Sequence, residues 1–223
     1  MIRLNIVAEG QTEQRFIEKL IKPHLAQINV FVSCHCVQTS SGGRIYSGGI
    51  SSFSNLKRNI ASWVRQDQQR DVRFTTMIDL YGLPGDFPGY GKAAKHSDPY
   101  KQVTELEENL GNEIADRRFI PYLQLHEFEA LLLSNPSAFK SYFKNANVGA
   151  LQALAKDLKS PELINTGEKT APSKRIIEII PQYSRLKAVA GPIIAAHTGL
   201  DKMREKCPHF HAWLSKLETL SSE

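Results

Sequence analysis

Apolar residues alternate with polar ones, or cluster with β-branched ones, in four short stretches that we predict as strands: residues 2–8, 30–38, 73–80 and 119–125. Between them, apolar side chains recur at the spacing of one helix face in three segments that we predict as helices: residues 12–27, 52–69 and 99–116. Strands that alternate with helices form a mostly parallel sheet covered on both faces. The pattern therefore predicts an α/β fold with a four-stranded sheet flanked by helices.

The other segments have different patterns. Gly and Ser are frequent in residues 40–49, and Gly and Pro in residues 81–91, so both are predicted as loops. Beyond residue 133 the pattern is helical, and prolines divide it into short predicted helices: Pro161, Pro172, Pro181, Pro192 and Pro208. We therefore predict an α/β domain over residues 1–133 and a helical appendage, packed on it, over residues 134–223.

The composition narrows the class of protein. With 41% hydrophobic and 23% charged residues the chain is ordinary for a globular protein, and it has no apolar run of the ~18 residues that a membrane span needs. The apolar run at the N-terminus is too short for a signal peptide. Three cysteines, Cys34, Cys36 and Cys207, follow no disulfide framework. We therefore expect a cytoplasmic protein, and its net charge of +5 allows nucleic acid as a partner.

Acidic residues follow three of the predicted strands. Glu9 closes the first strand, Asp79 lies at the end of the third, and Glu127 and Glu129 come after the fourth. In parallel sheets, ligands bind outside the carboxyl ends of the strands. Carboxylates that converge there repel each other unless a cation is present, and oxygen ligands without sulfur or imidazole select Mg²⁺ or Mn²⁺. The pattern therefore predicts a metal site, with helix caps or solvated turns as the alternative for each acid.

Two stretches resemble a known kind of domain. Residues 6–13, IVAEGQTE, resemble the start of Toprim domains, where a strand ends in Glu-Gly and a helix follows. Met77-Ile78-Asp79 resembles the Toprim aspartate position. Over nearly its full length the chain is similar to the domain-of-unknown-function 4276 family of bacterial proteins, through VAEGQTEQRF, MIDLYGLPGDFPG, PYLQLHEFEALL, TAPSKRI, AGPIIA and CPHFHAWL.

The resemblance implies a Toprim-like core and metal-dependent phosphodiester chemistry. Related Toprim proteins are often encoded beside an ATPase and act in defence against phage, so the resemblance also implies such a role. One position departs from the Toprim pattern, since Asp79 is followed by Leu80-Tyr81 instead of a second aspartate two residues later. Asp86, Glu127 or Glu129 are the candidates to replace it.

Candidate roles follow from this chemistry. Glu9 is expected as a metal ligand or general base and Asp79 as the principal ligand. Lys92 or Lys95, on the Gly-rich loop, would stabilise developing negative charge. Glu13 is expected to be an acid of the first helical turn, where the helix dipole favours it.

Basic residues outside this loop could bind nucleic acid. Arg44 follows Gly42-Gly43, and Lys174 and Arg175 belong to a basic stretch, so that with Lys92 and Lys95 they form the predicted phosphate-binding set. For each of them a solvated surface is the alternative. The segment Cys207-Pro208-His209-Phe210-His211 lacks a complete zinc ligand set and is expected to start a helix.

Three functions remain open at this point. The first is a Mg²⁺- or Mn²⁺-dependent nuclease, or a nuclease subunit that acts with an ATPase. The second is a non-catalytic partner of an ATPase, which the missing second aspartate favours. The third is a small-nucleotide phosphohydrolase, which a deep closed pocket would support.

Overall fold

A computed structural model of the chain describes residues 1–41, 44–47, 49–164 and 170–222. Its sheet has the strand order β2-β1-β5-β6, and every neighbouring pair is parallel. A short further strand, β7, pairs in parallel with the end of β5. The strands are β1 (Ile2–Ala8), β2 (Val30–Cys36), β5 (Val72–Asp79), β6 (Phe119–Ile120) and β7 (Leu123–Gln124). The predicted α/β fold is confirmed, with the fourth predicted strand present as the two pieces β6 and β7.

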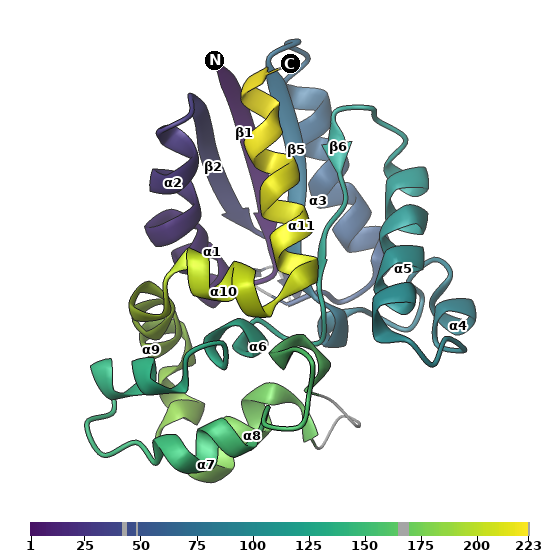
Figure 1. The fold of residues 1–223 in the computed structure, drawn as a ribbon. Coiled ribbons are helices and arrows are strands. Elements are labelled where there is room, and N and C mark those ends of the chain that lie inside the picture. Colours follow the sequence, from purple (N-terminus) through teal and green to yellow (C-terminus); the bar gives the residue numbers. More distant parts are fainter. Residues whose placement is uncertain (42–43, 48, 165–169, 223) are drawn as a thin grey trace.

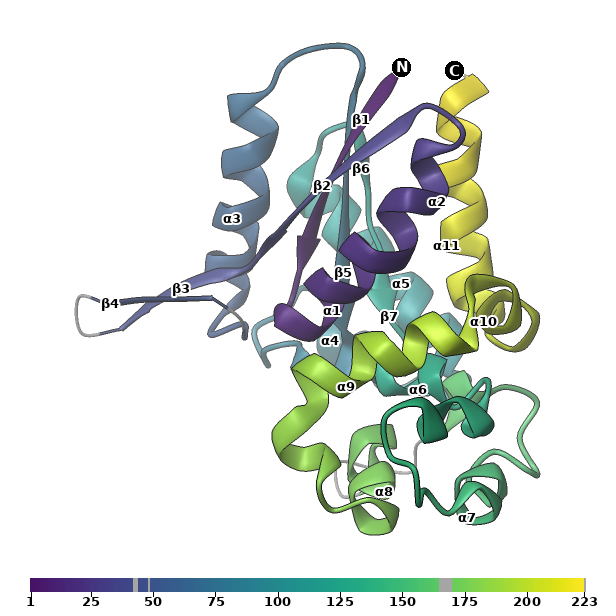
Figure 2. The same ribbon diagram turned by 90° about the vertical axis from the view of Figure 1, so that its left-hand side faces the viewer.

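Both faces of the sheet are buried under helices. One face carries α1 (Gln11–Phe16), a π-helical segment (Ile17–Ile21), α2 (Lys22–Ala26) and α11 (Pro208–Glu218). The other face carries α3 (Phe53–Gln66) and α5 (Pro99–Ile114). Figure 2 shows α3 on one side of the strands and α1, α2 and α11 on the opposite side.

The alternation within β1 explains this two-sided packing. Leu4 and Ile6 are fully buried in the hydrophobic cluster under α1 and α11, whereas Val7 belongs to the cluster under α3 and α5. Successive side chains of a strand point to opposite faces, so a strand buried on both sides needs apolar residues at both parities. The sheet therefore has two hydrophobic cores, one on each face.

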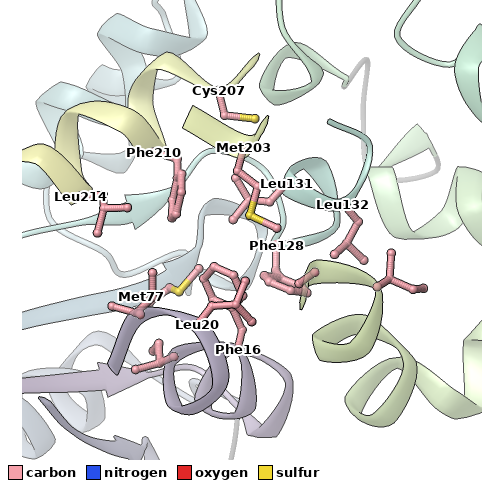
Figure 3. Close-up of a cluster of buried hydrophobic side chains, with 14 of the residues drawn as sticks. Phe16, Leu20, Met77, Phe128, Leu131, Leu132, Met203, Cys207, Phe210 and Leu214 are labelled. Atoms are coloured by element: carbon pink, nitrogen blue, oxygen red, sulfur yellow. The ribbon is translucent and has the colours of Figure 1, made fainter. Parts of the chain in front are cut away.

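The C-terminal half of the chain contributes helices to the first of these cores. Besides α11, it contains α6 (Glu129–Leu132), α7 (Val148–Ala153), α8 (Pro172–Ile179), α9 (Tyr183–Thr198) and α10 (Leu200–Lys206). Figure 3 shows Phe128, Met203 and Phe210 packed with Phe16 from α1. The ring of Phe16 lies 5.1 Å from that of Phe128 and 6.1 Å from that of Phe210. The predicted division at residue 133 stays a prediction, since this cluster contains residues from both sides of it.

One predicted helix end is wrong. Pro192 lies inside α9 instead of ending a helix. A proline has no N–H to donate to the carbonyl four residues earlier, which here belongs to Ala188. Arg15 of α1 supplies the missing donor, because its Nη1 donates to Ala188 O at 2.7 Å. A contact between distant segments therefore compensates for the helix bond that Pro192 removes.

The predicted loop at residues 40–49 is also corrected. A hairpin occupies part of it, formed by β3 (Gln38–Ser41) and β4 (Arg44–Ser47) in antiparallel pairing. Gly42, Gly43 and Gly48 lie outside the described residues. The predicted loop at 81–91 contains the end of a 3-10 turn (Leu80–Gly82) and the start of the four-residue helix α4 (Tyr90–Ala93).

A buried carboxylate anchors the start of α11. Glu162, fully buried, accepts hydrogen bonds from the main-chain N–H groups of His209 (3.0 Å) and Phe210 (2.9 Å). The ring of His209 in turn contacts Glu107 Oε1 at 3.0 Å and the carbonyl of Leu123 at 3.1 Å. The Cys-Pro-His-Phe-His segment is thus a helix start, as the sequence predicts.

No helix within residues 1–41, 44–47, 49–164 and 170–222 combines the length and the apolar character that crossing a membrane requires.

Candidate functional site

The strand order places a topological switch point beside β1. From β1 the chain passes through α1 and α2 to β2 on one side, and it later returns through α3 to β5 on the other side of β1. Because the two connections cover opposite faces, the carboxyl ends of β1 and β5 are at the place where sheets of this topology bind ligands. These ends point toward α6 and α9 in Figure 1. Glu9 follows β1 directly and Asp79 is the last residue of β5.

The two principal predicted acids are neighbours at this edge. The main-chain N–H of Asp79 donates to Glu9 Oε2 at 3.0 Å. Asp79 Oδ1 in turn accepts the main-chain N–H of Phe128 at 2.9 Å, which fixes the segment that leads into α6. The structure therefore brings Glu9 and Asp79 together, as their positions after parallel strands predict.

Because Gly82 has no side chain, the Glu9 carboxyl can occupy the space beside it. A Cβ at this position would lie 2.3 Å from Glu9 Oε2 and 2.5 Å from Oε1, both far below any normal contact. Sequence analysis missed Gly82, because it is one of several glycines in the 81–91 segment and nothing in the pattern separates it from the others.

Glu13 is a further acid of the site. It is buried in the first turn of α1, and its Oε2 accepts the main-chain N–H of Gly10 at 3.0 Å. Burial, together with the negative charges of Glu9 and Glu129, raises the pKa of Glu13 to about 7. The sequence placed Glu13 at a helix start, where its bond to Gly10 is local, whereas its proximity to Glu129 depends on the tertiary fold.

Glu127 and Glu129 approach the same place from the segment after β7. Glu127 accepts two hydrogen bonds from Ser173 at the start of α8, from its N–H at 2.7 Å and from its hydroxyl at 3.0 Å. Glu129 is buried, accepts the hydroxyl of Tyr183 at 3.2 Å and lies 3.4 Å from Nζ of Lys187. Helices α8 and α9 therefore supply the hydrogen-bond donors and the lysine that contact Glu127 and Glu129.

We call Glu9, Glu13, Asp79, Glu127 and Glu129 the carboxylate cluster. Burial raises the pKa of Asp79 well above its usual range, and the charges of the other four acids raise it further. Burial also raises the pKa of Glu9, with further increases from Glu127 and Glu129. Burial raises the pKa of Glu129 although Lys187 opposes the shift. Each carboxylate thus disfavours ionisation of its neighbours, which is the electrostatic environment that a bound cation relieves.

Whether the cluster can hold a metal ion depends on the geometry of its side chains. Among the residues that the structure describes, no three or more His, Cys, Asp or Glu side chains are arranged as a ready-made ligand set. Mg²⁺ usually keeps several waters and is held through one or two carboxylates. The all-carboxylate donor chemistry at Glu9 and Asp79 fits an ion of this kind.

Other predicted site residues have contacts elsewhere. Asp86 Oδ1 accepts the N–H of Phe53 at the start of α3 (2.9 Å). Lys92, with 80% of its side chain exposed, pairs with Glu105 of α5 at 2.8 Å. Lys95 is exposed after α4. An ion pair joins Lys187 to the cluster through Glu129, and sequence analysis missed this lysine.

The remaining predicted phosphate-binding residues are placed as follows. The main chain of Arg44 belongs to β4, and its side chain lies outside what the structure describes. Lys174 is exposed on α8, and Arg175 Nε donates to the carbonyl of Thr170 at 2.9 Å. Both follow Ser173, the partner of Glu127, so α8 presents basic residues next to the cluster.

Tyr81 lies two residues after Asp79. Its ring stacks on that of His126 with centroids 5.6 Å apart, and its N–H donates to the carbonyl of His126 at 3.2 Å. Burial raises the pKa of Tyr81 to about 12. Tyr81 therefore stays neutral near pH 7 and cannot replace the charge of an aspartate.

Comparison with proteins of curated function finds no match. Several solved structures resemble this chain, among them two from OLD proteins. The C-terminal region of the Burkholderia pseudomallei OLD protein is 16% identical, with a TM-score of 0.43 over 98% of each chain. The C-terminal region of the Xanthomonas campestris pv. campestris OLD protein is 14% identical, with a TM-score of 0.39 over 96% of this chain and 97% of that one. Similarity at this level carries no functional argument.

The sequence also matches the family described as domain of unknown function DUF4276, over residues 8–218. The match begins at the end of β1, includes all five acids of the carboxylate cluster and ends at the last residue of α11. The chain therefore belongs to the DUF4276 family.

Proposed function

We propose that this protein is a Mg²⁺- or Mn²⁺-dependent nuclease that hydrolyses phosphodiesters at the carboxylate cluster. The observation that carries the proposal is the convergence of five acids at the switch point of a parallel sheet: they come from α1, from two strand ends, from the segment before α6 and from the first residue of α6. Ligands of such sheets bind at this place.

Glu9 and Asp79 would hold the metal ion, with Glu127 and Glu129 nearest to complete its surroundings. When bound, such an ion neutralises phosphate charge and lowers the pKa of a coordinated water. Glu13, whose pKa is about 7, suits the exchange of a proton at its carboxyl near neutral pH. Nζ of Lys187 supplies positive charge beside Glu129.

Cleavage assays test the proposal. Purified protein is incubated with DNA and with RNA in the presence of Mg²⁺ or Mn²⁺, alongside Glu9→Gln, Asp79→Asn and the control Glu178→Gln on the exposed side of α8. We expect metal-dependent cleavage that both cluster variants lose and the control keeps. Cleavage that survives Glu9→Gln would place the chemistry elsewhere.

A second candidate function is a non-catalytic partner of an ATPase. It is favoured by the hydrogen bonds that Glu9 Oε2 and Asp79 Oδ1 already accept from main-chain N–H groups, which is how structural carboxylates are used. Thermal unfolding with and without Mg²⁺ separates the two. A metal site raises the Tm of the wild type and not that of Glu9→Gln; no shift, together with no cleavage, would favour the partner function.

A further inference from the structure

A basic cavity lies at the end of the sheet opposite to the carboxylate cluster. It has a volume of about 940 Å³ and is formed where the chain enters β5 and β6, with the last turns of the C-terminal helix along one side. Its charged lining residues are Arg70, Arg73, Arg117, Arg118, Lys216 and Asp116. Five cations therefore face one acid.

The acids near this cavity are already paired. Arg3 of β1 bonds to both Asp67 and Asp71, and these bonds lower the pKa of each carboxyl. Asp116 is held by Arg118 in a two-pronged pair, with Nε at 3.0 Å and Nη2 at 2.9 Å. Because other arginines neutralise these three acids, the remaining cations of the cavity keep their positive field.

The arginines of the cavity have different roles. Arg118 is structural, since it also donates to the carbonyls of Asp67 (2.6 Å) and Val64 (3.1 Å) and lies over the ring of Phe74. Arg70, Arg117 and Lys216 are exposed, and no ion pair involves them within the described ranges 1–41, 44–47, 49–164 and 170–222. These three side chains are accessible to a ligand.

We propose that this cavity binds the sugar-phosphate backbone of a nucleic acid. Guanidinium groups bind phosphate oxygens in pairs, and lysine adds a point charge. The choice of nucleic acid as the source of the phosphate groups rests on the proposed function. The positive charge of the cavity is an observation that is independent of that proposal. The cavity is separate from the carboxylate cluster, because the eight residues of β5 that connect the two regions extend about 23 Å.

Binding measured without divalent metal tests the proposal. A labelled 20-nucleotide single strand is titrated with wild type and with the triple variant Arg70→Gln, Arg117→Gln, Lys216→Gln. A second triple variant, Lys140→Gln, Lys144→Gln, Lys156→Gln, is the control, because it removes the same charge from exposed positions away from the cavity. ATP serves as the free-nucleotide probe.

We expect the cavity variant to bind about 100-fold more weakly at 0.1 M salt, with the slope of log K against log salt reduced by roughly 2, from ~0.7 per lost contact to a single strand. The control variant should bind like the wild type. Equal weakening in both triple variants would overturn the proposal, because only net charge would then matter. Binding of ATP without binding of the strand would also overturn it. Since no cleavage is measured, a failure of the proposed nuclease activity would leave this result intact.

Discussion

Gly82→Ala tests whether the position of the Glu9 carboxyl matters for function. The new Cβ would lie 2.3 Å from Glu9 Oε2, whereas ordinary contacts start at 3.4 Å, so the carboxyl has to move by about 1 Å. The atoms displaced are the far end of a flexible side chain, and the backbone at Gly82 does not need a positive φ. We therefore expect a change in unfolding free energy below about 1 kcal/mol.

Activity should respond far more strongly than stability. Displacement of a reacting or ligating group by about 1 Å costs on the order of 100-fold in rate. The assay is kcat/KM for metal-dependent cleavage, with urea unfolding of each variant in parallel. Gly85→Ala is the matched control, since a Cβ at Gly85 in the same segment meets nothing within 4 Å. If Gly82→Ala cleaves like Gly85→Ala, Glu9 does not act at the position seen in the structure.

Three further predictions concern stability. Glu162→Ala leaves two buried N–H groups at the start of α11 without an acceptor, at about 1–3 kcal/mol each, so thermal unfolding should show a clearly lower Tm. The pKa of Glu13 is raised from 4.5 to about 7, so its protonated carboxyl stabilises the fold, and this stability is lost as pH rises through 7. In urea unfolding, the unfolding free energy of Glu13→Gln should therefore exceed that of the wild type by up to about 3 kcal/mol at pH 9 and should equal it at pH 4. Trp213→Phe removes the bond from its indole N–H to the hydroxyl of Thr75 (3.0 Å) and should cost about 1 kcal/mol, a loss that a double-mutant cycle with Thr75→Val assigns to this pair.

The sequence allows the sheet and the principal acids to be predicted, because both depend on local patterns. The apolar runs before Glu9 and Asp79 identify buried strands, and parallel strands bring their carboxyl ends to one edge. That geometry places both acids at one edge of the sheet, and the pairing of β1 with β5 then makes them neighbours.

Features that depend on contacts between distant segments could not be predicted. Pro192 reads as a helix end until Arg15 is known to donate to the freed carbonyl of Ala188. Lys187 is an ordinary helical lysine until α9 packs beside Glu129. The 40–49 segment reads as a loop because Gly and Ser weaken the strand signal, although residues 38–41 and 44–47 pair as antiparallel strands.

The position of α11 has a consequence for how the chain folds during synthesis. Trp213 bonds to Thr75 across 138 residues of sequence and stacks on Tyr122 with centroids 4.3 Å apart. Until the ribosome has released this helix, the face of the sheet that it covers is open to water and to other chains. With translation at roughly 5–20 residues per second, several seconds pass between the synthesis of the last strand and the synthesis of α11, which covers this face. During this interval the apolar face of the sheet stays accessible to other chains, although β1 to β7 have already been synthesised.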